Sequence, residues 1–68
     1  MAVLAQVELT RFTIDVEFLS GGDRFASETY EVEATDWFSA EREALERSVG
    51  SAYDNARIPN LTRRALAR

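Results

Sequence analysis

The sequence alternates strictly between apolar and polar residues over one stretch, Phe12-Thr13-Ile14-Asp15-Val16-Glu17-Phe18. A period of two is typical of a β-strand with one buried and one exposed face. A second alternating stretch, Tyr30-Glu31-Val32-Glu33-Ala34, follows the turn-forming residues Ser20-Gly21-Gly22-Asp23. Residues 11–34 are therefore predicted to form an antiparallel β-hairpin.

The register of this hairpin follows from matching the apolar residues of its two strands. A two-residue loop at Gly21-Gly22 would place Phe12 opposite Glu31, so the apolar residues of one strand would pair with polar residues of the other. A loop over residues 21–23 shifts the register by one and gives the pairs Phe12–Val32, Ile14–Tyr30, Phe18–Ala26 and, outside, Arg11–Glu33. We predict this second register. It leaves Glu28 opposite Val16 on the apolar face, so Glu28 is expected to lie at an edge.

After the hairpin the apolar residues recur at helical spacing. Asp36 is a good N-cap, and the pattern runs from Trp37 until Pro59 prevents its continuation. The sequence thus predicts one long amphipathic helix over residues 36–57. Two ion pairs at i,i+4 spacing are expected on its solvent side, Glu43–Arg47 and Arg42–Glu46.

The two ends of the chain complete a single α+β domain. Residues 1–10 carry apolar side chains in the opposite phase to the first strand, so we expect a third strand or arm that pairs with the hairpin or with another copy. Residues 57–68 hold four arginines and no acid, and residues 58–68 are predicted to be a short basic segment that docks on a neighbour. The predicted fold is an antiparallel hairpin packed by one long helix.

Composition excludes most enzyme chemistry. The 68 residues include no histidine and no cysteine, so a conventional catalytic triad, a reactive thiolate and a zinc site are ruled out. The carboxylate pairs Asp15/Glu17 and Glu31/Glu33 have the spacing to hold a divalent cation, but no loop of ligand spacing accompanies them. We predict no enzymatic activity, no metal and no cofactor.

The sequence also favours a compartment and a source. No apolar run approaches the ~20 residues that span a bilayer, and the opening residues lack the positive start of a secretory signal. We expect no membrane partner and a cytoplasmic location, in a host cell or a virus particle. All eight cations are arginine, beside ten alanines, a composition that favours a high-GC, actinobacterial-type genome or a virus of one.

The join between the second predicted strand and the predicted helix carries a family resemblance. It reads Tyr30-Glu31-Val32-Glu33-Ala34-Thr35-Asp36, followed by Ala40-Glu41 and Ala44. This stretch of about 15 residues resembles small uncharacterised ββα proteins of actinobacterial viruses. The resemblance implies a bacteriophage source and carries no functional residues across.

Small size favours association with a protein partner. A chain of this length buries only about 60% of its unfolded surface, and without a disulfide or a metal the remaining route to stability is assembly. We therefore expect a non-enzymatic protein-interaction or assembly module, either a structural accessory or a host-directed regulator, that self-associates or binds a larger protein. The predicted contact residues are Val7, Leu9, Trp37, Phe38, Arg57, Arg63, Arg64 and Arg68.

Charge segregation suggests an alternative function. Four carboxylates share the outer face of the predicted hairpin, namely Asp15, Glu17, Glu31 and Glu33, and the net charge is −4. Such a face could mimic nucleic acid and inhibit a DNA- or RNA-binding protein. Direct nucleic-acid binding by the C-terminal arginines is disfavoured, because the acidic body would repel phosphates and no aromatic residue lies among them. Trp37 and Phe38 are neighbours and cannot both be centred on the core side, so either one of them is exposed to a partner or, as we favour, both cap the apolar face of the hairpin.

Overall fold

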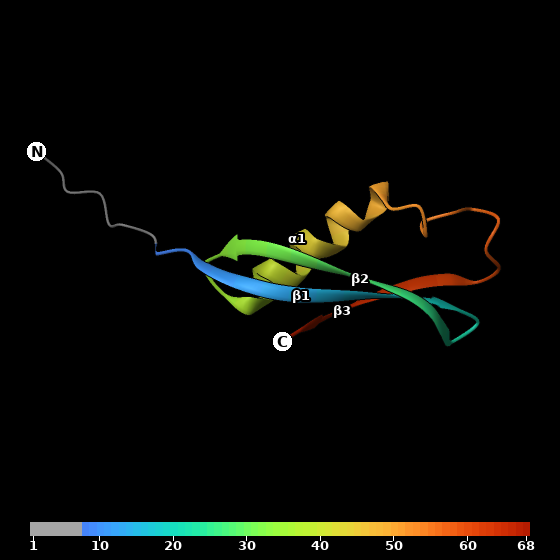
Figure 1. Cartoon of the computed structure of the whole chain (residues 1–68), viewed down its shortest axis with the longest axis horizontal. Helices are drawn as coiled ribbons and strands as arrows, with labels where there is room; N and C mark the ends of the chain where they lie inside the picture. Colours follow the sequence, from blue (N-terminus) through green and yellow to red (C-terminus); the bar gives the residue numbers. More distant parts are fainter. Residues whose placement is uncertain (1–7) are drawn as a thin grey trace, which may run out of the picture.

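The computed structural model describes residues 8–68, so most of the arm predicted over residues 1–10 lies outside the described residues. Its elements are strand β1 (Thr10–Ser20), strand β2 (Asp23–Ala34), helix α1 (Trp37–Arg47), the 3₁₀ turn η1 (Ser48–Gly50) and strand β3 (Leu61–Ala67). The strands form an antiparallel sheet in the order β2-β1-β3, and α1 crosses one face of it (Figure 1). The predicted α+β class is confirmed.

The hairpin has the predicted register. The structure contains all the expected pairs, namely Arg11–Glu33, Phe12–Val32, Ile14–Tyr30 and Phe18–Ala26. The apolar members of these pairs lie on the face that α1 covers, so the matching of apolar residues was a sufficient guide to the register.

The loop differs from the one predicted. Ser20 pairs with Asp23, so Gly21-Gly22 is a two-residue turn, and both glycines have positive φ, 58° and 90°. Such φ values suit the type I′ turn that follows the twist of a hairpin. The register shifts by one residue beyond Phe18, which leaves Phe25 unpaired as a β-bulge. The bulge reconciles a two-residue turn with the pairing of apolar residues.

The core lies between α1 and the sheet. Its buried members are Ile14, Val16 and Phe18 of β1, Val32 and Ala34 of β2, and Ala40 and Ala44 of α1. β1 supplies the largest of them because a central strand is covered by neighbours on both sides as well as by the helix. Fully burying a side chain such as Phe18 contributes about 1.5–3 kcal/mol, and the two alanines let the helix approach the sheet closely.

Helix α1 is shorter than predicted. It ends at Arg47, η1 ends at Gly50, and residues 51–60 form turns and irregular backbone, so the helix predicted over residues 36–57 is wrong in its second half. Ser48 is buried, and its hydroxyl donates to the Leu45 carbonyl at 2.6 Å, a local bond that competes with helix continuation. Gly50 follows, with the poorest helix propensity after proline.

The beginning of α1 is as predicted. Asp36 caps it, because its Oδ1 accepts a hydrogen bond from the Ser39 backbone N–H at 2.7 Å. The Glu43–Arg47 ion pair forms at 2.6 Å. The ion pair expected between Arg42 and Glu46 is not among those formed by residues 8–68.

The C-terminal residues are a strand of the sheet and not a docking segment. β3 pairs with β1 in the same chain, from Ser20–Leu61 to Ile14–Ala67, which overturns the prediction that residues 58–68 dock on a neighbour. Asn60 takes a positive φ of 51°, and the Ser20 hydroxyl donates to the Pro59 carbonyl at 2.7 Å. The hydrogen bond from Ser20 holds the beginning of β3 against the end of β1, next to the hairpin turn.

Two adjacent substitutions in β3 test this arrangement. Ala65 packs against the core, whereas Leu66 lies on the opposite, exposed face. Ala65→Gln should lower the free energy of unfolding by about 2 kcal/mol, because it forces a larger, polar side chain into the packed face. Leu66→Gln should change it by less than about 0.5 kcal/mol. Urea denaturation followed by circular dichroism measures both, and equal effects would contradict the observed register.

Candidate functional surfaces

The chemistry-bearing side chains lie on open surfaces. Over residues 8–68 the structure has no pocket and no group of three or more acidic side chains placed to hold a metal ion. Within the same range, no helix has the length and apolar character needed to cross a membrane. Three surfaces carry the residues of interest, namely the outer face of the sheet, its two edges and the outward side of α1.

The outer face of the sheet is charge-balanced. Side chains at odd-numbered positions of β1 point away from α1, and the residues of β2 that pair with these positions lie on the same face. The predicted carboxylates are therefore all on the outer face, namely Asp15, Glu17, Glu31 and Glu33. The same face carries four arginines, Arg11, Arg24, Arg64 and Arg68. Its formal charge is therefore zero, and the predicted acidic face is an alternating arrangement of both signs.

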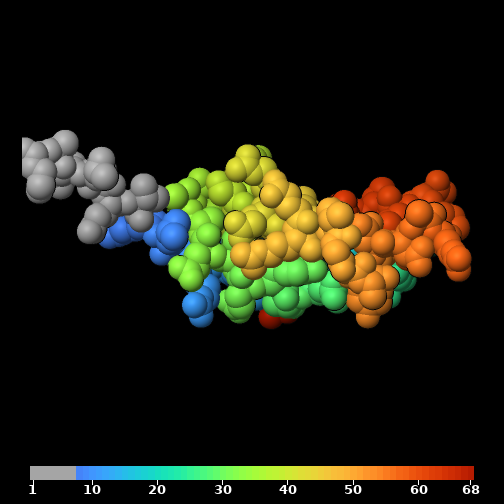
Figure 2. Space-filling view, turned by 90° about the horizontal axis from the view of Figure 1, so that it is seen from above, coloured from blue at the N-terminus to red at the C-terminus, as the bar shows by residue number. Residues whose placement is uncertain are grey.

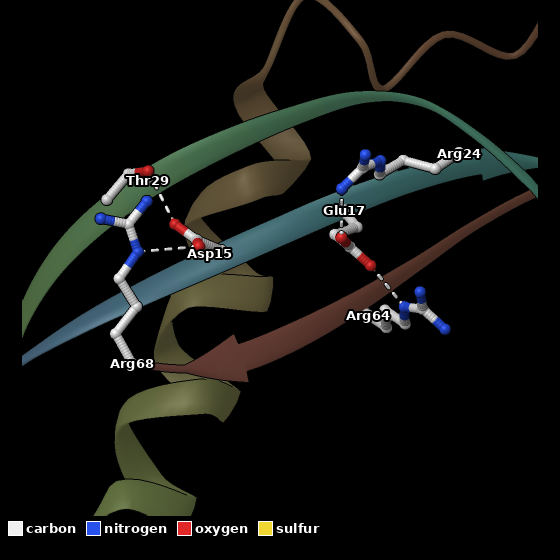
Figure 3. Close-up of polar contacts among 6 residues, drawn as sticks. All are labelled: Asp15, Glu17, Arg24, Thr29, Arg64 and Arg68. Carbon is white, nitrogen blue, oxygen red and sulfur yellow. Dashed lines mark hydrogen bonds and ion pairs between the residues drawn. The ribbon is translucent and has the colours of Figure 1, made fainter.

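Glu17 is the centre of this arrangement. Its Oε1 accepts a hydrogen bond from Arg64 Nε at 2.5 Å, and its Oε2 accepts one from Arg24 Nη1 at 2.9 Å (Figure 3). The carboxylate side chain is only 9% exposed, although it is on the face opposite the core. Arg64 and, to a lesser extent, Arg24 hold the pKa of Glu17 below its usual value. One carboxylate thus joins all three strands.

Asp15 lies two residues before Glu17 on the same face of β1 and makes a similar bridge between strands. Its Oδ2 accepts a hydrogen bond from Arg68 Nε at 2.9 Å and its Oδ1 accepts one from the Thr29 hydroxyl at 2.7 Å (Figure 3). The bond from Arg68, followed by that from Thr29, lowers the pKa of Asp15, and the same ion pair raises the pKa of Arg68. Asp15 therefore also ties β3 and β2 to the central strand.

Most of the predicted contact arginines are engaged within the chain. Arg64 and Arg68 hold the two carboxylates just described. Arg63 is on the helix-facing side of β3, where its Nη1 lies 3.7 Å from a carboxylate oxygen of Asp54. Arg57 is exposed in the segment between η1 and β3. Sequence reasoning missed the ion pairs of Arg64 and Arg68 because their partners are more than 45 positions away in the sequence, and no local signal reveals such a pairing.

Side chains of α1 and β2 protect both edges of the sheet. On β2, Arg47 Nη1 donates to the Glu31 carbonyl at 3.0 Å, and on β3 the Ala67 backbone N–H donates to Glu41 Oε2 at 3.1 Å. Glu28 lies on the helix-facing side of β2, as predicted at an edge, and accepts a hydrogen bond from the Tyr30 hydroxyl at 3.0 Å. An inward-facing charge and capped backbone groups are features that prevent edge-to-edge pairing of sheets.

The aromatic residues that open α1 are exposed. Trp37 and Phe38 retain 54% and 69% of their accessible surface, and their rings meet edge to face with centroids 5.6 Å apart. The expectation that both cap the hairpin is therefore wrong. The Asp36 cap sets a helix phase that turns Ala40 toward the sheet and leaves Phe38 on the other side.

Of the two other predicted contact residues, Leu9 and Val7, the structure describes only Leu9. Leu9 is exposed and precedes Thr10, whose partner in the hairpin is Ala34, so it is close to the beginning of α1. Val7 lies outside the described residues. At the far end, Phe25 and Tyr53 pack around the buried Phe18 with ring centroids 5.5–6.4 Å apart and so extend the core.

The charge bridges predict a specific loss of stability in acid. Glu17→Gln removes the charge that faces two arginines, so at pH 7 it should lower the melting temperature. Because the pKa of folded Glu17 is below the unfolded value of 4.5, its stabilisation is present above pH 4.5 and is lost as the pH falls through the folded value. The two melting temperatures should therefore converge as the pH is lowered below 4.5 and through the folded pKa.

The control for this experiment is Glu8→Gln. Glu8 is exposed and forms none of the ion pairs found among the described residues, so its substitution should leave the melting curve unchanged across the same pH range. Melting is followed by circular dichroism. A Glu17→Gln protein as stable as the wild type at pH 7 would show that the bridge contributes nothing.

Comparison with known proteins adds no further constraint. A scan against protein-family models, a search of curated proteins and a search of solved structures each found no match. The functional argument therefore starts from the geometry of this chain.

Proposed function

We propose that this chain is a non-enzymatic protein-interaction or assembly module that binds its partner through apolar side chains exposed at α1. The observation that carries the proposal is the adjacent pair Trp37 and Phe38, both more than half exposed. Tryptophan and other aromatic side chains are enriched at the centres of protein interfaces, where their burial contributes much of the binding energy. Two such residues side by side on a small protein are costly to leave in water.

The remaining surfaces are less suited to partner binding. Each sheet edge has a backbone group already bonded to a side chain of α1, through Arg47 and Glu41. Three of the four carboxylates on the outer sheet face form ion pairs within the chain, and a partner would have to compete with those ion pairs. These features favour α1 as the binding surface.

The charge balance of the outer face also weighs against the alternative function. A protein that mimics nucleic acid has to present a sustained negative potential. Here Asp15 and Glu17, two of the four carboxylates expected to supply it, are bonded to arginines of the same face. We therefore propose the interaction module alone.

Trp37 itself reports on this function because it is the only tryptophan in the chain. Association should bury its ring, so its emission should shift to shorter wavelength and acrylamide quenching should fall as the protein concentration rises. Phe38→Ser should abolish the concentration dependence and retain the fold. Leu66→Ser is the matched control, since Leu66 is an exposed apolar residue on the other side of the sheet.

A larger partner is tested with the same variants. Wild-type and Leu66→Ser proteins immobilised at equal density should retain the same protein from an extract of the source cells, and Phe38→Ser should not. If Trp37 stays equally accessible to acrylamide at every concentration and no retained protein distinguishes Phe38→Ser from the control, the proposed function is wrong.

A further inference from the structure

We propose that the partner bound by α1 is a second copy of this chain, with the two α1 helices antiparallel across a two-fold axis. This inference rests on the proposed function and assigns its partner. It is carried by the pattern of side chains on the outward side of α1, which is complementary to itself when one copy is reversed.

Four exposed residues form a stripe that runs along α1 and into the following turn η1, and we call them the outward stripe: Phe38, Arg42 and Glu46 of α1, and Val49 of η1. Their spacing of four, four and three residues places them on one side of a helical segment. That side is opposite the buried alanines that face the sheet. In the space-filling view, α1 (yellow to orange) lies open on the surface, and no other described segment covers it (Figure 2).

The stripe has an apolar residue at each end and opposite charges between them. When a second stripe is laid against it in the reverse direction, Phe38 of one copy faces Val49 of the other, and Arg42 faces Glu46. The two-fold axis makes each contact occur twice, as in any isologous interface. The arrangement therefore yields two apolar contacts at the ends and two ion pairs near the centre.

The parallel arrangement lacks this complementarity. It would place Arg42 against Arg42 and Glu46 against Glu46, and like charges across an interface are strongly unfavourable. The two charged side chains also form no ion pair with each other or with other residues in the part of the chain that the structure describes. They are thus available to a second copy without breaking an existing ion pair.

The interface would be small, which sets how the dimer should behave. The stripe is about 16 Å long, at a rise of 1.5 Å per residue from Phe38 to Val49. Contacts of this size belong to the weak and transient class of interfaces. We therefore expect a monomer–dimer equilibrium that depends on concentration and not a permanent dimer.

Charge reversal provides the test. Arg42→Glu gives a stripe with two acids and Glu46→Arg gives a stripe with two arginines, so each variant alone should dimerise on the order of tenfold or more weakly than wild type. An equimolar mixture of the two should dimerise again, because every acid then faces an arginine of the other copy. The double variant with both reversals should also regain dimerisation by itself. Sedimentation velocity from about 10 µM to about 1 mM measures all four samples.

The control is Arg57→Glu, which makes the same change of charge as Arg42→Glu at an exposed position outside the outward stripe. This protein should dimerise as the wild type does. Recovery in the mixture of single variants supports the proposal, since a change of helix stability within one chain cannot be repaired by mixing.

Two results would overturn the inference, and they differ in what they say of the proposed function. If wild type associates in a Phe38-dependent manner but the single charge variants associate equally well, then the partner surface is not the antiparallel stripe and the proposed function stands. If wild type remains monomeric up to about 1 mM, the second copy is not the partner; the extract experiment then decides the proposed function separately.

Discussion

The fold depends on the position of β1 between the other two strands. Each strand beside it protects one edge of β1, and α1 covers one of its faces, so the side chains of Ile14, Val16 and Phe18 are fully buried. The other face of β1 has no helix, yet Glu17 on that face is also largely covered. Arginines from both neighbouring strands cover it, and a single carboxylate thereby orders three strands that have few apolar residues to hold them together.

This use of charge explains why a chain with so small a core can include β3. The strand contributes Leu61 and Ala65 to the helix-facing side, which is little apolar surface for seven ordered residues. Its outer side contributes Arg64 and Arg68, each in contact with a carboxylate of β1. Hydrogen bonds between charged groups are stronger than those between neutral ones. The arginines of the C-terminal residues therefore stabilise the fold by pairing with carboxylates of the same chain.

The sequence was a good guide where the signal was local or periodic. The hairpin register, the Asp36 cap, the Glu43–Arg47 pair and the edge position of Glu28 were all predictable, because each depends on alternation or on short spacing. The sequence was a poor guide to β3, where Arg63 interrupts the apolar alternation and the partner strand is distant. It also misled beyond Ser48, where Ala52 and Tyr53 continue the helical spacing although the backbone has left the helix.

The same errors explain why the sequence also predicted an acidic surface and a basic binding segment that the fold does not provide. If the C-terminal arginines were unpaired, the sheet carboxylates would form an acidic surface and residues 58–68 would form a basic binding segment. In the structure Arg64 and Arg68 pair with carboxylates of β1, so these opposite charges balance each other. Two sets of side chains on helix α1 are relevant to the proposed function. Its flanking residues Glu41 and Arg47 bond to the sheet edges, which discourages association through strands. Phe38 on the outward side of α1 and Val49 in the following turn η1 stay exposed, and for this reason we propose that association occurs there.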